Sequence, residues 1–109
     1  MPWLLRDGDV LATAEIAADR RSRRRGLLGR DGIDGALVLR PCRHVHTVGM
    51  RFRIDVALVA QDGEVLKTSS LRPWRLAPIA RGCSWVVEAQ FGAFERWSLK
   101  PGDVLEVKE

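Results

Sequence analysis

Two β-rich runs joined by an Asp-Gly turn constrain the fold of this chain more than any other feature. The runs cover residues 53–60 and 65–71, and Asp62-Gly63 lies between them. An Asp-Gly pair between two such runs predicts a β-hairpin, because its turn needs residues that tolerate positive φ. The first run contains IDVALVA, which is apolar on both faces of an extended chain. We therefore expect it to be a central strand rather than an edge strand.

The rest of the chain predicts more strands and one helix. Strands are expected at 10–17, 36–39, 85–89 and 104–107, and residues 91–97 are expected to form a short helix or a turn. Asp19 is a suitable N-cap for a helix over 20–28, and Gly29 is a natural stop for it. Gly26 lies inside this helix, where close approach of another backbone would explain it. The prediction is a mainly β (α+β) fold: a small, mostly antiparallel sheet or barrel of about six strands, with one helix packed on it.

Length and composition indicate an ordinary folded protein. With 109 residues, 46% of them hydrophobic, the chain is expected to form a single domain over 1–109. Residues 1–10 hold no apolar core of a signal peptide, and no stretch is long enough to span a membrane. Two cysteines are few for a secreted domain of this size, so both are expected to be reduced. These observations favour a cytoplasmic location, and the oligomeric state stays open.

Excess positive charge lies in the first half of the chain. The net charge is +4, and residues 20–25 read RRSRRR. An exposed basic helix of this kind is usually a solvated face, but it can also bind phosphate groups. Nucleic-acid binding through Arg20–Arg25 is therefore one functional hypothesis. A recognised nucleic-acid motif, a Gly-rich phosphate loop and a nucleophile elbow are all absent from the sequence.

Cys42, His44 and His46 raise the possibility of a metal site or a thiol site. Residues two apart in an extended segment point to the same side, and a thiolate with two imidazoles suits zinc or copper. Three residues in a straight row cannot all reach one ion unless the segment bends. The alternative is a thiol nucleophile at Cys42 or Cys83 with a histidine as base. We expect no cofactor, and a small metal- or thiol-dependent enzyme that uses Cys42 and His46 is kept as an alternative.

Asp55 and Glu88 are carboxylates within apolar strands. A charge in such a place is costly unless it is paired, so each is expected to accept hydrogen bonds inside the fold or to belong to a pocket with shifted pKa values. Trp74, in a loop with two prolines between Arg72 and Arg75, is a further candidate for contact with a ligand or a base.

Five ordered motifs resemble the domain of unknown function 192 (DUF192) family, also called the uncharacterised protein family UPF0127. The resemblance extends from about Ala12 to Val107. The motifs are RGLLGR at 25–30, the segment from Cys42 to Asp55 with His46, Thr47 and Met50, the turn at Asp62-Gly63, Val87-Glu88 followed by Gly92, and Gly102-Asp103. Leu28 stands where the family usually has methionine, and His46-Thr47 replaces the more frequent Trp-Met-Lys-Asn-Thr form.

The resemblance implies a compact, mainly β fold with one helix and no established reaction. Many relatives carry a secretion signal or a lipid anchor. The resemblance also makes a polar network beside the central strand, rather than His44, the main candidate for a site. The leading hypothesis is a non-enzymatic accessory module that binds a small molecule or a protein partner. Its predicted site residues are His46, Thr47, Met50, Asp55 and Glu88.

Overall fold

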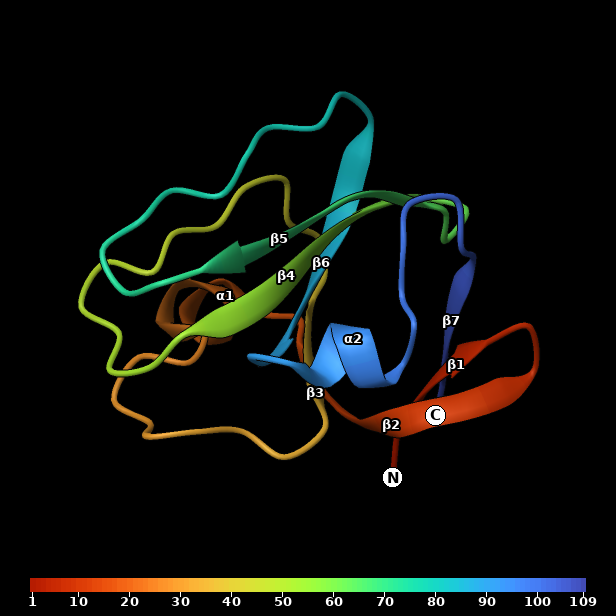
Figure 1. Ribbon diagram of the computed structural model, residues 1–109, viewed down its shortest axis with the longest axis horizontal. Helices are drawn as coiled ribbons and strands as arrows, with labels where there is room; N and C mark the ends of the chain where they lie inside the picture. Colours follow the sequence, from red (N-terminus) through yellow and green to blue (C-terminus); the bar gives the residue numbers. More distant parts are fainter.

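A seven-stranded sheet and two short helices make up the structure, a computed structural model that describes residues 1–109 (Figure 1). The strands lie in the order β5-β4-β6-β3-β2-β1-β7. Neighbouring strands are antiparallel except β2 and β3, which are parallel. The mainly β fold is thus confirmed. In chain order the elements are β1 (Trp3–Arg6), β2 (Asp9–Ala17), α1 (Arg20–Arg25), β3 (Ala36–Leu39), β4 (Ile54–Ala60), β5 (Val65–Leu71), β6 (Cys83–Gln90), α2 (Ala93–Arg96) and β7 (Leu105–Lys108).

The predicted hairpin is formed by β4 and β5. Their register runs from Ile54↔Leu71 to Val59↔Val65, and Gly63 in the turn has a φ of 99°. The other edge of β4 pairs with β6, so β4 is central, as its two apolar faces predicted.

Each face of the sheet carries its own core cluster of fourteen buried residues. Successive β4 residues alternate between them: Val56 and Leu58 belong to one cluster, Ala57 and Val59 to the other. Leu27, just after α1, belongs to the same cluster as Val56, whereas Phe94 of α2 belongs to the cluster on the opposite side. The two helical regions therefore cover opposite faces, and we name these the α1 face and the α2 face.

Two details of the sequence predictions differ from the structure. The structure has seven strands rather than about six, because β1 is a four-residue strand that was not predicted. Helix α1 ends at Arg25 instead of Leu28. Gly26, at φ 51° and ψ −125°, turns the chain away and donates its N–H to the Ser22 carbonyl. The N-cap is as predicted, since Asp19 Oδ1 accepts the Ser22 N–H at 2.7 Å.

The sheet curls without closing into a barrel. Its outermost strands, β5 and β7, meet only at one end, through an isolated bridge between Glu64 and Val104. The Val65 N–H donates to the Asp103 carbonyl, and the Leu105 N–H donates to the Gly63 carbonyl, both at 2.8 Å. These bonds attach the tip of the β4–β5 hairpin to the start of β7.

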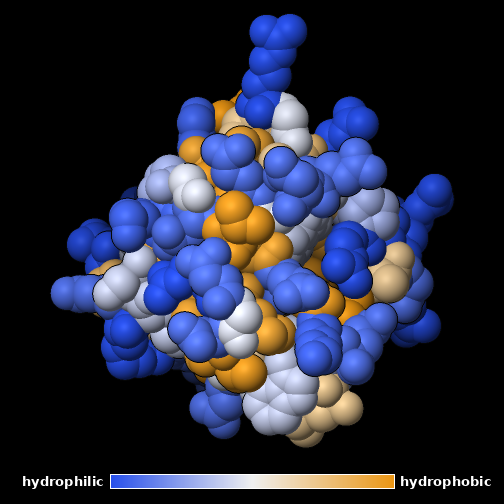
Figure 2. Space-filling view, turned by 90° about the vertical axis from the view of Figure 1, so that its right-hand side faces the viewer, coloured by the Kyte–Doolittle hydropathy of each residue, from blue (hydrophilic) through white to orange (hydrophobic).

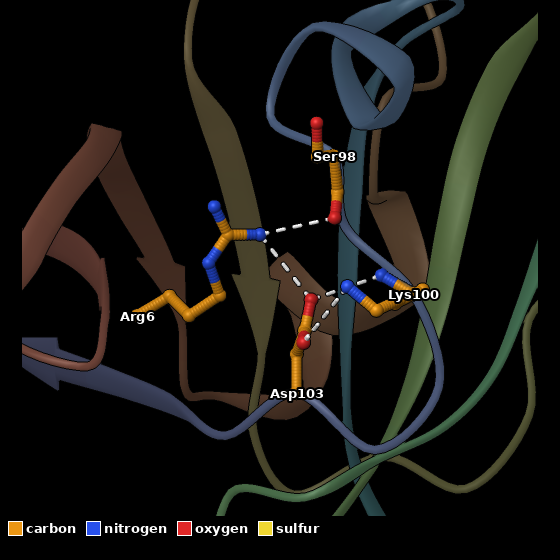
Figure 3. Close-up of polar contacts among 4 residues, drawn as sticks. All are labelled: Arg6, Ser98, Lys100 and Asp103. Carbon is orange, nitrogen blue, oxygen red and sulfur yellow. Dashed lines mark hydrogen bonds and ion pairs between the residues drawn. The ribbon is translucent and has the colours of Figure 1, made fainter.

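A polar cluster fixes the turn before β7 to β1 (Figure 3). The Arg6 guanidinium donates to Asp103 Oδ2 and to the Ser98 carbonyl, each at 3.2 Å. Burial opposes ionisation of Asp103, but the Lys100 N–H and the positive charges of Lys100 and Arg6 outweigh it and lower the pKa of this carboxyl.

The end of the molecule that carries β1 and β7 shows hydrophobic atoms between charged side chains (Figure 2). Trp3, Val10 and Val104 are exposed hydrophobic residues of this region. Neither helix of the structure is long and apolar enough to cross a bilayer.

Candidate functional site

A cavity of about 150 Å³ lies between α1 and the α1 face of the sheet. Four separate segments bring their side chains to it: α1 with the turn that follows, the end of β3, the loop over 42–50, and β6. Its lining residues are Arg23, Arg24, Arg25, Gly26, Leu27, Leu28, Leu39, Cys42, His44, Val45, His46, Met50 and Glu88.

Glu88 is the most unusual of these residues. It lies in β6 between Leu37 of β3 and Val56 of β4, and only 3% of its surface is exposed. Its Oε1 atom is buried and has no hydrogen-bond partner in the protein. Burial raises the pKa of Glu88 from 4.5 to about 7. A buried carboxyl group that borders a cavity and lacks a partner is a strong candidate for ligand contact.

Three arginines of α1 line the same cavity without neutralising Glu88. The salt bridges of the structure join Arg6, Arg30, Arg51 and Lys100 to acidic residues, and none involves α1 or Glu88. Arg23 donates to the Ala18 carbonyl at the start of the helix. The cavity therefore combines an unpaired carboxyl with guanidinium groups that are free of carboxylate partners.

Gly26 lets the chain pass close to Glu88. A Cβ atom at this position would lie 3.5 Å from Glu88 Oε1, and the backbone conformation is one that other residues rarely adopt. The sequence predicted another backbone as the close neighbour of Gly26, whereas the structure places the carboxyl side chain of Glu88 there.

The two histidines are held by different backbone groups. The ring nitrogen Nε2 of His44 donates to the Ala77 carbonyl at 2.9 Å. His46 Nδ1 accepts the Val48 N–H at 3.2 Å, which places the ring proton of the neutral form on Nε2. An isolated bridge with Leu76 fixes the backbone of His46. His46 therefore offers one N–H donor at the cavity that has no partner in the protein.

The surroundings of both thiols disfavour nucleophilic chemistry. Burial, followed by the proximity of Cys83 and Glu88, raises the pKa of the Cys42 thiol, and burial likewise raises the pKa of Cys83. A thiol with a raised pKa stays protonated near neutral pH and is a poor nucleophile. Cys42, His44 and His46 all border the cavity, but no three His, Cys, Asp or Glu side chains come together in a way that could hold a metal ion.

Thr47 fixes a neighbouring loop instead of lining the cavity. It is fully buried, and its hydroxyl donates to the Arg72 carbonyl at 2.6 Å and accepts the Arg75 N–H at 2.9 Å. Its own N–H donates to the Arg75 carbonyl, and its carbonyl accepts the N–H groups of Trp74 and Met50. Met50 is buried and does line the cavity.

Asp55 lies on the opposite side of the sheet from Glu88. Val56, not Asp55, stands opposite Glu88 in the β4–β6 register, so the two carboxyl groups project to different faces. Asp55 Oδ2 accepts the N–H groups of Gly92 and Phe94 at 3.0 and 3.1 Å, at the start of α2. The structure thus brings His46, Met50 and Glu88 together and separates Asp55 from them.

Sequence reasoning missed the arginines of α1 as members of this site. The run over 20–25 was interpreted as an exposed face. Arg24 and Arg25 are exposed, but together with Arg23 they also border the cavity. Gly26 was the available signal, because a glycine beside a basic run marks the point where the helix meets the sheet.

Relatives of this chain are found both by sequence and by structure. The sequence model of DUF192, described as an uncharacterised ACR, matches residues 4–107. A UPF0127 protein of Pyrococcus furiosus is 37% identical over 62 residues, which cover 57% of this chain and 53% of that protein. The match therefore spans about half the length of this relative.

Two crystal structures share the fold. A protein of unknown function from Novosphingobium aromaticivorans DSM 12444 has a TM-score of 0.82 at 19% identity, over 96% of this chain and 82% of the other. A protein of Sinorhizobium meliloti 1021, provisionally described as a transcription regulator, has a TM-score of 0.72 at 20% identity, over 97% and 91% of the two chains.

Proposed function

Since this chain belongs to the DUF192 family, whose description states no activity, we propose its function from the geometry: it is a binding module for a small polar molecule, held in the cavity beneath α1. The observation that carries the proposal is Glu88 Oε1, which is buried beside this cavity without a hydrogen-bond partner. An unsatisfied buried carboxyl group destabilises the fold, and a ligand that supplies the missing hydrogen bond removes that cost.

The ligand must present a hydrogen-bond donor to Glu88. With a pKa of about 7, Glu88 populates both the neutral and the ionised form near neutral pH. A hydroxyl group satisfies either form, and an ammonium group favours the ionised form. The cavity volume of about 150 Å³ limits the ligand to a few heavy atoms.

The other end of the ligand is expected to be an anion. Arg24 and Arg25 line the cavity and form no salt bridge with the protein, and guanidinium groups bind carboxylate and phosphate in a bidentate geometry. The Nε2–H of His46 supplies a further donor. The preferred ligand therefore carries a hydroxyl or amine at one end and a carboxylate or phosphate at the other.

The state of the thiols disfavours the thiol-dependent alternative. The two cysteines have raised pKa values, so neither offers a thiolate to attack a bound molecule. Thr47 acts on the cavity indirectly, since it holds Met50 and the loop that packs beside His46. Nucleic-acid binding through Arg20–Arg25 stays a prediction.

A titration with four small probes tests the proposal. Isotope-labelled protein is titrated with ethanolamine (donor alone), acetate (anion alone), glycine and phosphoethanolamine (both), and amide shifts are followed by NMR. Glycine or phosphoethanolamine is expected to bind at least tenfold more tightly than either single-ended probe, with the largest shifts at Gly26, Leu28 and Glu88. Tenfold corresponds to about 1.4 kcal/mol.

Matched variants make the test specific. Glu88→Gln is expected to weaken the amine-bearing probes about tenfold or more, because the carboxamide keeps the shape of the side chain but loses its charge. Glu106→Gln removes an exposed carboxylate of β7 and should leave binding unchanged. Equal affinity of all probes for the parent protein and the Glu88 variant, or no shifts around the cavity, would refute the proposal.

A further inference from the structure

We propose that the loops over 40–53 and 72–82 form a surface that docks on anionic lipid bilayers. This surface is separate from the cavity function, because its exposed apolar side chains do not line that cavity. Trp74, Leu76 and Ile79 are among the most exposed hydrophobic residues of the molecule, at 65%, 68% and 75%. We call these three residues together with Arg43, Arg72, Arg75 and Arg81 the loop face.

The two loops are one structural unit. They run next to each other at the left of Figure 1, at the end of the molecule away from β1 and β7. A bridge pairs His46 with Leu76, and the Ala77 N–H donates to the Val45 carbonyl at 3.0 Å. The loop face is therefore presented by a hydrogen-bonded support rather than by a free segment.

Trp74 is held outward at a conformational cost. Its φ is 66°, in the left-handed region that a residue with a large side chain seldom adopts. The hydrogen bond from the Trp74 N–H to the Thr47 carbonyl, at 2.9 Å, and those between Thr47 and Arg75 hold it there. An indole kept exposed by a strained and well-anchored backbone is preorganised for contact with another surface.

The charge of the two loops has one sign. Residues 40–53 and 72–82 contain no Asp or Glu, while Arg43, Arg72, Arg75 and Arg81 are exposed. No salt bridge of the structure involves these four arginines. A partner of the loop face must therefore present a negatively charged surface that is wide enough to contact several of these arginines.

The apolar residues decide between the possible anionic partners. Bases of nucleic acids stack on aromatic rings, but Leu76 and Ile79 have no ring on which a base could stack. Surfaces that bind bilayer interfaces combine three kinds of residue. An indole lies at the level of the lipid headgroups, aliphatic side chains lie beside it, and arginines surround them. An anionic bilayer therefore accounts for all three kinds of residue at once.

Vesicle sedimentation tests this inference. The protein is mixed with phosphatidylcholine vesicles that contain either no anionic lipid or about 30 mol% phosphatidylglycerol, at low and at about 0.5 M salt. Binding is expected only to the anionic vesicles, with an affinity that falls at high salt. Arg72→Gln with Arg75→Gln is expected to reduce affinity by roughly twenty-five-fold, at about fivefold for each arginine.

The apolar contribution is tested separately. Trp74→Ser with Leu76→Ser is expected to reduce vesicle binding at least tenfold, whereas Trp3→Ser with Val10→Ser, at the other end of the molecule, should have no effect. Unchanged thermal unfolding of both double variants shows that the fold is retained. Absence of binding to anionic vesicles at low salt, or binding unaffected by the Trp74 and Leu76 changes, overturns the inference. Arginine-dependent binding of a duplex oligonucleotide without binding of vesicles also overturns it.

Discussion

Glu88 carries a free-energy cost that the rest of the molecule must offset. Its carboxyl group is buried in β6, and the protein supplies no donor for Oε1. The folded state therefore holds a proton on Glu88 more tightly than the unfolded chain does, where the pKa is about 4.5. As the pH rises from 4.5 through 7, stability is lost, because the unfolded chain releases this proton freely whereas the folded protein must either keep it or bury a charge.

The pH dependence of stability measures this cost. The difference between a pKa of 4.5 and one of about 7 corresponds to about 3 kcal/mol. This is the largest decrease in the free energy of unfolding that ionisation of Glu88 can cause. Glu88→Gln is expected to be more stable than the parent protein at pH 8, and to gain much less at pH 4.5. Urea denaturation at several pH values provides the measurement. A gain that is the same at both pH values would contradict the assigned pKa.

Single residues also show how far the sequence could be interpreted. Asp55 and Glu88 were both recognisable as carboxylates in apolar strands, and a shared network was a reasonable hypothesis. Whether they meet depends on the β4–β6 register, in which a shift of one residue moves a side chain to the other face. Register is set by contacts between distant segments, so the separation of Asp55 from Glu88 could not be derived from the sequence.

At the scale of elements, α2 depends on a strand far from it in the chain. The helix is four residues long, too short to be stable alone, and Gly92 at its N-cap has no side chain to cap it. Asp55 of β4 takes that role by accepting the N–H groups of Gly92 and Phe94. The carboxylate predicted as part of a binding site serves here to join the helix to the sheet.

Removing this acceptor should loosen α2. Asp55→Ala leaves two amide donors without a partner and is expected to lower the free energy of unfolding by about 2–4 kcal/mol. Hydrogen exchange of the Phe94 amide should accelerate more than that of amides in β1. Asp55→Asn keeps an acceptor oxygen and should lose less than half as much. Equal losses in both variants would contradict the capping role.

Elements with local signals were predicted well, and those that depend on distant pairing were not. The β4–β5 hairpin and the Asp19 cap follow from turn and cap residues that are close in sequence. The strand β1, with only four residues, is stabilised by β2 and β7 on its two sides, and the parallel pairing of β2 with β3 also joins separate segments. Nothing in the residues of β1 alone indicates those partners.

At the scale of the whole molecule, the contact between the hairpin tip and the start of β7 decides how the curled sheet is held. Gly63 lies directly against the backbone of Leu105, and a Cβ atom there would overlap the Leu105 carbonyl oxygen. Gly8 also has a positive φ, of 84°, but no atom lies within 4 Å of the position of its Cβ. Comparing substitutions at these two glycines therefore separates the cost of backbone strain from the cost of disrupting close packing.

Gly63→Ala is expected to cost about 3 kcal/mol or more, and Gly8→Ala about 1 kcal/mol. Both variants strain the backbone, but only the first also forces β7 away from the hairpin. Chemical denaturation gives the two free energies, and exchange of the Leu105 amide, which donates to the Gly63 carbonyl, reports the local opening. Similar losses in the two variants would mean that the contact with β7 is unimportant.

The pairing of β1 with β7 has a consequence for the order in which the chain folds. Trp3 stands opposite Lys108 in this ladder, so the two strands enclose almost the whole sequence between them. Closing so large a loop is entropically slow compared with closing the short turn between β4 and β5. The hairpin can therefore form early and recruit β6, whereas β1 and β7 must wait until both ends of the sequence are available. The same pair is expected to be the last to assemble and the first to separate when the native state fluctuates.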